Sequence, residues 1–396
     1  MRLRYSYRYI FFIVSIYLFV FQNLITEYLP IFKYFDEFFA LLCLPIFVFR
    51  GKLKKNTDSI TGLLMLCVLI GLISSIIFQY QSLVPVISDI LIFCKFFMIC
   101  YISASMWSEN MIDRYKKSIK TNIRIIIMIM FVLTALHYSI GLYSGEIRYG
   151  LLSNKLFYSH ETYLAAICIF LYSLYLISSN KVLDIYVVAL IVILLSTLRV
   201  KAFGGALIFA AVVIIVCGTK KRISFDKIIV FGLVLFVLFY NVISYYFFSD
   251  RLDMARGQML IKSIQIANDH FPLGAGFATF GSYYSGEYYS CLYDKYGLSG
   301  IWGLSRIFHD YIADAFWPML IGQFGYIGCI IYMGILYKLL KKIQNSFNIG
   351  NIYMYIAKMG CFLYLLVSSI AENSFAGPIA ISFAVIIGIS SKERTV

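Results

Sequence analysis

The chain has 396 residues, of which 61% are hydrophobic and only 14% are charged. Soluble domains carry roughly 25% charged residues and cannot bury this much apolar side chain, so the composition excludes a water-soluble protein. The formal net charge of +14 would suggest nucleic-acid binding in a soluble chain. Here the positions of the basic residues indicate membrane topology instead, and we expect no nucleic-acid partner.

The apolar residues gather in runs of about 20, the length that a helix needs to cross ~30 Å of hydrocarbon. The first run, residues 9–28, is too long for the apolar part of a signal peptide and has no small-residue cleavage site, so we expect a retained helix. The sequence predicts an all-α, polytopic transmembrane bundle of about twelve helices, forming one integral membrane domain over residues 1–396. The predicted spans are 9–29, 35–49, 60–79, 86–106, 125–143, 161–179, 182–198, 202–218, 228–248, 316–337, 352–371 and 374–390.

Basic residues concentrate in alternate connections between these spans. If the N-terminus lies in the cytoplasm, the cytoplasmic segments hold 22 of the 34 Lys and Arg residues, in accord with the positive-inside rule. Both termini are therefore predicted to be cytoplasmic. The segments assigned to that side are 1–8, 50–59, 107–124, 180–181, 219–227, 338–351 and 391–396.

Lys95 and Lys358 are the main charges inside the predicted spans. Lys95 lies about 13 Å into its helix, at 1.5 Å per residue. A charge at that depth is costly, so we expect a polar cavity or a partner for Lys95 on another helix.

The segment 194–207, LLSTLRVKAFGGAL, interrupts the apolar pattern at the outer surface. Its cations, Arg199 and Lys201, lie where they cannot serve as cytoplasmic anchors. Two interpretations stay open: the side chains reach toward lipid headgroups, or they clamp an anionic ligand. Arg suits a clamp because its planar fork binds phosphate oxygens in pairs.

One outer connection, residues 249–315, is far longer than the others, and long loops of this kind are usually functional. Residues 251–269 read as an amphipathic helix, and PLGAGF, residues 272–277, as a tight reversal. A second helical pattern, residues 305–322, is predicted to pass directly into the next span, so that Arg306 and Asp310 share a face beside His309. We expect this loop to form a lid with two short helices rather than a separate domain.

Several of these residues resemble motifs of the O-antigen polymerase and ligase family. They are the run from Arg251 through PLGAGFATFG, a histidine close to the next helix, the Ser-Thr-Leu-Arg step at 196–199, and an FG-Y-G step at Phe324, Gly325, Tyr326 and Gly328. Family members have about twelve helices, cytoplasmic termini and one large periplasmic loop late in the chain. Asp310 departs from the Asn or Ser that members often have after the loop histidine.

The resemblance implies an O-antigen polymerase in a bacterial inner membrane, a glycosyltransferase that joins undecaprenyl-diphosphate-linked oligosaccharide repeat units at the periplasmic face without metal or cofactor. It implies that Arg199 and Arg256 hold the leaving diphosphate, with Lys201, Arg251 or Arg306 assisting. His309 would be the base for the acceptor hydroxyl, because its ordinary pKa is near neutral. Asp310 or Asp314 would orient or replace it, and Tyr283, Tyr284, Tyr288 and Tyr289 would stack on sugars.

Two alternatives stay open from the sequence. One is a ligase that transfers finished chains to the lipid A core. The other is a flippase for lipid-linked oligosaccharide, which should line its path with charges inside many helices. Charges here concentrate in the loops, which favours an enzyme that works at one face. Besides its lipid-linked substrate and membrane lipids, the resemblance suggests a chain-length regulator protein as a partner.

Overall fold

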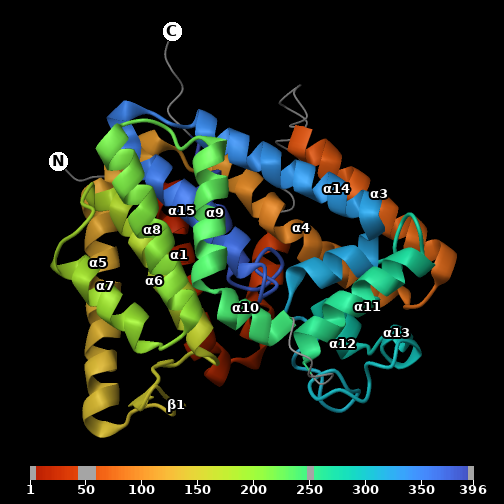
Figure 1. The fold of residues 1–396 in the computed structure, drawn as a ribbon. Helices are drawn as coiled ribbons and strands as arrows, with labels where there is room; N and C mark the ends of the chain where they lie inside the picture. Colours follow the sequence, from red (N-terminus) through yellow and green to blue (C-terminus); the bar gives the residue numbers. More distant parts are fainter. Residues whose placement is uncertain (1–5, 43–58, 248–253, 391–396) are drawn as a thin grey trace.

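The computed structural model describes residues 6–42, 59–247 and 254–390 (Figure 1). Eight of its helices are long and apolar enough to cross a membrane, which confirms an all-α polytopic membrane protein. Pairing of strands in the described residues is limited to a hairpin of β1 (Ile147–Arg148) and β2 (Leu151–Leu152). The eight helical segments are α1 Tyr7–Tyr28, α3 Ser59–Phe78, α4 Leu83–Met106, α5 Glu109–Ile140, α6 Glu161–Ser179, α8 Val200–Thr219, α14 Phe316–Asn345, and η2 with α15, Ile349–Ser368.

The remaining predicted spans correspond to shorter helices. They are α7 (Ile185–Ser196), α9 (Phe225–Leu238) followed by α10 (Tyr240–Phe247), and α16 (Ala380–Gly388). The predicted span 35–49 follows the short helix η1 (Pro30–Tyr34) and is helical over residues 35–42, where its described part ends. Helix α5 is longer than predicted, because it extends through the polar stretch 109–124 before it enters the apolar run.

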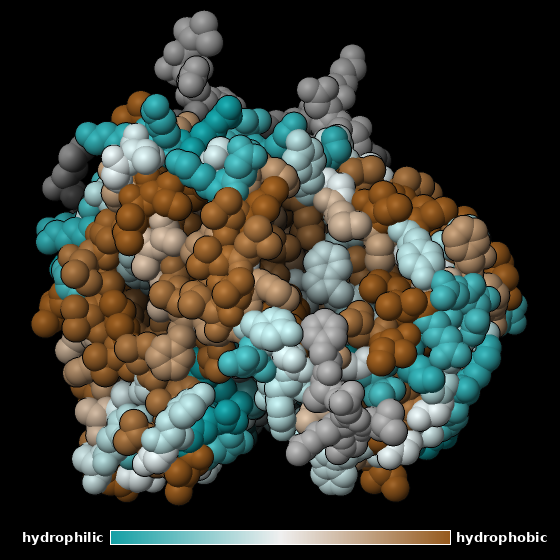
Figure 2. All heavy atoms as spheres, viewed as in Figure 1, coloured by the Kyte–Doolittle hydropathy of each residue, from teal (hydrophilic) through white to brown (hydrophobic). Residues whose placement is uncertain are grey.

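The bundle has two polar ends. At one, which we call the terminal end, the indole N–H of Trp107 donates to the carbonyl of Arg8 (3.1 Å), and the N–H of Glu109 donates to the carbonyl of Ser390 (3.0 Å). The start of α1 and the end of α16 therefore lie together. The segment 254–315 lies at the opposite end, which we call the loop end (Figure 1). A band of apolar side chains separates the two in Figure 2, as expected for a protein embedded in a bilayer.

The described part of the outer loop is a packed structure. It contains α11 (Ala255–Asp269), α12 (Tyr283–Glu287) and α13 (Cys291–Lys295), so the predicted amphipathic helix is confirmed over its described part. The loop also has a small hydrophobic core of its own. That core consists of Met259, Ile266, Ala275, Phe280, Leu292, Tyr293, Tyr296, Leu298, Leu304 and Ile312.

The PLGAGF reversal packs against a break in α14. Gly325 interrupts this helix with φ 61° and ψ −165°, and the N–H groups of Ala275 and Gly276 donate to the carbonyls of Gly322 and Gln323, both at 2.9 Å. A Cβ atom on Gly274 would lie 2.4 Å from the backbone nitrogen of Gly325. Glycine is therefore required for this approach, and the two motifs of the resemblance are in direct contact.

The predicted helix over residues 305–315 is wrong. These residues form turns, and α14 begins only at Phe316. The hydroxyl of Ser305 accepts from the N–H of Phe308 (3.1 Å), a local bond that competes with helical pairing. Tyr311 folds back onto Gly303, to whose carbonyl its N–H donates (3.0 Å).

This correction separates two predicted neighbours. Arg306 does not share a helical face with Asp310, because the backbone between them is not helical. Its guanidinium instead forms an exposed ion pair with Asp294, 3.3 Å away.

Candidate functional site

A large cavity of about 2290 Å³ lies at the loop end and extends into the bundle. Its described lining carries seven cationic and seven acidic side chains. The cations are Lys33, Lys95, Arg148, Lys155, Arg199, Lys201 and Arg256, and the acids are Glu27, Asp36, Glu37, Glu146, Asp310, Asp314 and Glu372. The formal charges of the lining therefore cancel, so any selectivity for an anion must come from the local arrangement of the cations.

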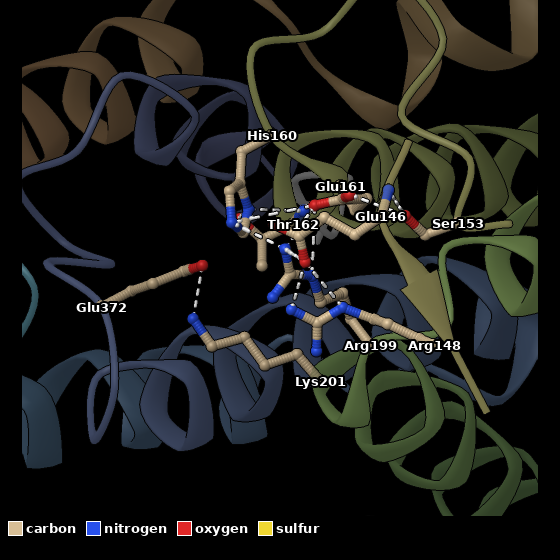
Figure 3. A network of polar contacts seen from close by, with 9 residues as sticks. All are labelled: Glu146, Arg148, Ser153, His160, Glu161, Thr162, Arg199, Lys201 and Glu372. Atoms are coloured by element: carbon tan, nitrogen blue, oxygen red, sulfur yellow. Dashed lines mark hydrogen bonds and ion pairs between the residues drawn. The ribbon is translucent and has the colours of Figure 1, made fainter. Parts of the chain in front are cut away.

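Arg199 precedes α8, in the tight connection that follows α7. Its Nε donates to the Glu161 carboxylate at 3.2 Å, and its Nη2 lies 2.9 Å from Nε2 of His160 (Figure 3). Glu161 also accepts from the hydroxyl of Ser153 (2.8 Å) and is almost fully buried. Oε2 of Glu146 lies 3.6 Å from the same Nη2, so two carboxylates hold the guanidinium in place, and Nη1 of Arg199 makes no hydrogen bond within the described residues.

His160 immediately precedes α6, and its Nδ1 lies 2.9 Å from the hydroxyl of Thr162. Nδ1 also accepts from the backbone N–H of Thr162 (3.2 Å), and a guanidinium can only donate, so both ring nitrogens of His160 face N–H donors. Burial and the neighbouring charge of Arg199 both hold the pKa of His160 below its ordinary value. The sequence prediction assigned no role to this residue, although a His-Glu pair directly before an apolar run was visible in the sequence.

Lys201 and Arg256 each have an acidic partner as well. Lys201 forms an ion pair with Glu372 and donates to the carbonyl of Ala371 (3.3 Å). Arg256 donates from Nη2 to Asp314 at 2.8 Å. Burial raises the pKa of Asp314, against the opposing effect of Arg256 and Lys201. Arg199 before α8, Lys201 in the first turn of α8, and Arg256 in α11 thus reach one cavity, each held by a carboxylate.

Lys95 has the partner that its depth required. Its ammonium forms an ion pair with Asp36, and Oε1 of Glu37 lies 3.6 Å away. Lys95 and Asp36 are each 1% exposed, whereas the Glu37 side chain is 15% exposed. All three residues line the cavity, and the sequence prediction named neither acid.

Several buried polar atoms of the lining have no hydrogen-bond partner. Buried side-chain polar atoms are normally paired, so such atoms mark places where a ligand or water completes the bonding. In the described residues that line the cavity these atoms are Asp36 Oδ1, Glu37 Oε2, Arg256 Nε, Tyr283 Oη, Asn373 Oδ1 and Ser374 Oγ.

Other predicted site residues divide between the cavity and its surroundings. Tyr283 and Asp310 line the cavity, and Tyr284 packs edge-on against Tyr283 with ring centroids 5.2 Å apart. His309 and Arg306 are not among the residues that line it. The ring of His309 lies against Gly286 instead, with Nδ1 3.3 Å from the carbonyl of Arg306.

Arg251, predicted to assist in diphosphate binding, lies outside the described residues.

Comparison with known proteins adds no relative. The sequence matches no protein-family model, and a search of curated proteins finds no similar sequence. The functional assignment therefore depends on the residues of the cavity themselves.

Proposed function

We propose that the protein is an O-antigen polymerase, which joins undecaprenyl-diphosphate-linked oligosaccharide repeat units into polysaccharide at the periplasmic face of a bacterial inner membrane. One observation carries the proposal. Arg199 and Lys201, at the start of α8, and Arg256, in α11, line one large cavity of the membrane bundle. Such a cavity suits a substrate with an anionic headgroup and a lipid tail.

The chemistry requires a stabilised leaving group. Glycosyl transfer from a lipid diphosphate breaks the bond between the anomeric carbon and a phosphate oxygen, so negative charge develops on the diphosphate. Cations already fixed in a water-poor site stabilise such charge by about 3 kcal/mol each. Glu161 and Asp314 fix Arg199 and Arg256, and the unpaired Nε of Arg256 is a buried donor ready for a phosphate oxygen.

His160 would act in this site as a positioning residue. Its Nε2 accepts from Arg199, so the imidazole helps to orient the guanidinium and is not free to take a proton from a sugar. His309, the predicted base, lies outside the cavity lining, and the proposed mechanism therefore assigns no proton transfer to it.

The proposed sidedness follows from the charge distribution. In the sequence, the segments assigned to the cytoplasm carry the basic excess that marks that side, and one of them, 107–124, begins with Trp107 at the terminal end. We therefore assign the loop end to the periplasm and both termini to the cytoplasm. A phosphatase reporter fused at Gly286 should be active, and an inactive but well-expressed fusion would reverse the orientation.

A deletion strain tests the function directly. A polymerase null should carry lipid A core with one repeat unit and no longer ladder, whereas a ligase or flippase null should carry none attached. A ladder unchanged by the deletion would end the proposal. A change in the most abundant chain length only would indicate a chain-length regulator rather than the polymerase.

Complementation then tests the site. Arg256→Ala should abolish chain extension at normal membrane levels, while Lys262→Ala, on the same helix but outside the cavity, should restore the wild-type ladder. His309→Ala tests the sequence prediction separately, and a wild-type ladder would remove that histidine from the site.

A further inference from the structure

Not every acid of the cavity forms an ion pair with Arg199, Lys201 or Arg256. Arg199 pairs with Glu161 and, at 3.6 Å, with Glu146. Lys201 pairs with Glu372, and Arg256 pairs with Asp314. Asp36 and Glu37 stand apart, since the cation that contacts them within the described chain is the buried Lys95.

This second group has one positive charge for two carboxyl groups. Lys95 forms its close ion pair with Asp36, which leaves Glu37 only partly neutralised at 3.6 Å. Oδ1 of Asp36 and Oε2 of Glu37 are both buried without a donor. The two carboxyl groups can hydrogen-bond to each other only when one of them holds a proton. The two carboxyl groups can therefore accept a hydrogen bond from a hydroxyl group, or one of them can bind a proton.

The chemical class of the occupant follows from these charges. A diphosphate would be repelled by two carboxyl groups with one lysine between them, whereas a sugar hydroxyl supplies the donor that both oxygens lack. Helix α12 of the outer loop lies nearby, since the ammonium of Lys33, four residues before Glu37, is 5.5 Å from the ring centroid of Tyr283. Burial and then the charge of Glu37 raise the pKa of Tyr284 to about 12. Tyr283, the neighbour of Tyr284, lines the same cavity.

We propose that Asp36 and Glu37, held by Lys95, form a subsite for the acceptor sugar, and that Glu37 receives the proton of the attacking hydroxyl. This inference rests on the proposed function. It divides the cavity into an anionic-headgroup subsite at Arg199, Lys201 and Arg256 and a neutral carbohydrate subsite at the two carboxyl groups.

The step balances without a further reactant. The acceptor oxygen attacks the anomeric carbon of the donor while its proton moves to Oε2 of Glu37. The bond between that carbon and the diphosphate oxygen breaks, and the electron pair leaves on the diphosphate. The proton on Glu37 is stabilised by a hydrogen bond to Asp36. It returns to water or to the departing diphosphate before the next cycle.

The test separates the two subsites by using two readouts on the full-length protein. Chain extension is read from lipopolysaccharide ladders in the deletion strain, and headgroup binding is read with sugar-free undecaprenyl diphosphate on purified protein in phosphatidylglycerol vesicles. Glu37→Gln should reduce extension by at least about 100-fold, as for loss of a general base, yet bind the probe within about twofold of wild type. Arg256→Ala should lose both chain extension and binding of the probe. Glu287→Gln, at an exposed acid of α12 that does not line the cavity, should keep both extension and probe binding.

The other possible outcomes decide between the acceptor subsite and the proposed function. Normal extension by Glu37→Gln, with extension lost in Arg256→Ala, removes the acceptor subsite and leaves the proposed function standing. Loss of probe binding by Glu37→Gln shows a structural role and also overturns the inference. Partial extension by Glu37→Asp, which keeps the carboxyl group, supports it. If wild-type protein gives no ladder in the deletion strain, the proposed function itself fails.

Discussion

The carboxylate of Asp89, inside α4, accepts a hydrogen bond from the backbone N–H of Ala278 in the outer loop, at 2.6 Å. The same oxygen accepts from the side-chain amide of Gln323 at 2.9 Å, so one acid joins α4, the loop and α14. The segment around PLGAGF is thus anchored below the surface rather than resting on it.

Replacing Asp89 by Leu should release this anchor. Two buried donors would be left without an acceptor, at a cost of about 1–3 kcal/mol each. We expect a lower midpoint of thermal unfolding in detergent and faster proteolysis within residues 254–315. Asp89→Asn keeps an acceptor oxygen, so its unfolding midpoint should lie between those of Asp89→Leu and wild type. Equal stability of the Leu variant and wild type would show that the bonds contribute little.

The close approach of Gly274 and Gly325 gives a second prediction. Gly274→Ala places a Cβ 2.4 Å from the Gly325 nitrogen and also strains a residue with φ +80°, so it should destabilise the protein by more than the roughly 1 kcal/mol of backbone strain alone. Gly297 is the matched control. It also has positive φ, +70°, but a Cβ there meets nothing within 4 Å. If the unfolding curves of Gly274→Ala and Gly297→Ala coincide, the close contact of residue 274 with Gly325 does not contribute to stability.

Arg199 should not tolerate lysine. The guanidinium donates to Glu161 and His160 at once, and a single ammonium cannot reproduce this fork or leave further planar donors for phosphate. We expect Arg199→Lys to bind undecaprenyl diphosphate at least about tenfold more weakly than wild type, a loss of roughly 1.4 kcal/mol. Binding restored to the wild-type level by lysine would mean that charge alone suffices at this position.

His160 should make stability depend on pH. The pKa of this imidazole is lowered from 6.5 by burial and by Arg199, so the folded protein resists the protonation that the unfolded chain accepts. Its contribution to stability is therefore full above the ordinary pKa and is lost as the pH falls through the lowered one. The difference in unfolding midpoint between wild type and His160→Gln should shrink on acidification from about pH 7 to pH 5. A constant difference would show that the ring does not titrate in this range.

The sequence predicted the architecture well because bilayer thickness limits the length of apolar runs. It also predicted a break between two spans near Arg199, although the break lies at 197–199 and Lys201 belongs to α8. The reversal at PLGAGF was predicted because its glycines permit positive φ. The helix at 305–315 was predicted wrongly. Its spacing is helical, but the side chain of Ser305 and the contact of Tyr311 with Gly303 favour turns.

The parts of the site that escaped prediction depend on contacts between distant segments. Asp36 and Glu37 read as ordinary residues near a helix start, and only the approach of Lys95 from α4 gives them a role. His160 likewise gains its significance from Arg199, which is 39 residues away along the chain. Periodicity reports which face a residue occupies within one helix. It does not report which side chain of another helix will meet it.

The cancelling charges of the cavity lining have a consequence for how a substrate arrives. A region without net charge exerts little field beyond the Debye length, about 8 Å at physiological ionic strength. A headgroup that diffuses in the plane of the membrane would therefore meet the cavity at a rate nearly independent of salt. Discrimination would begin on contact, when phosphate oxygens compete with Glu161, Glu372 and Asp314 for their cations, and salt would then alter the residence time more than the rate of encounter.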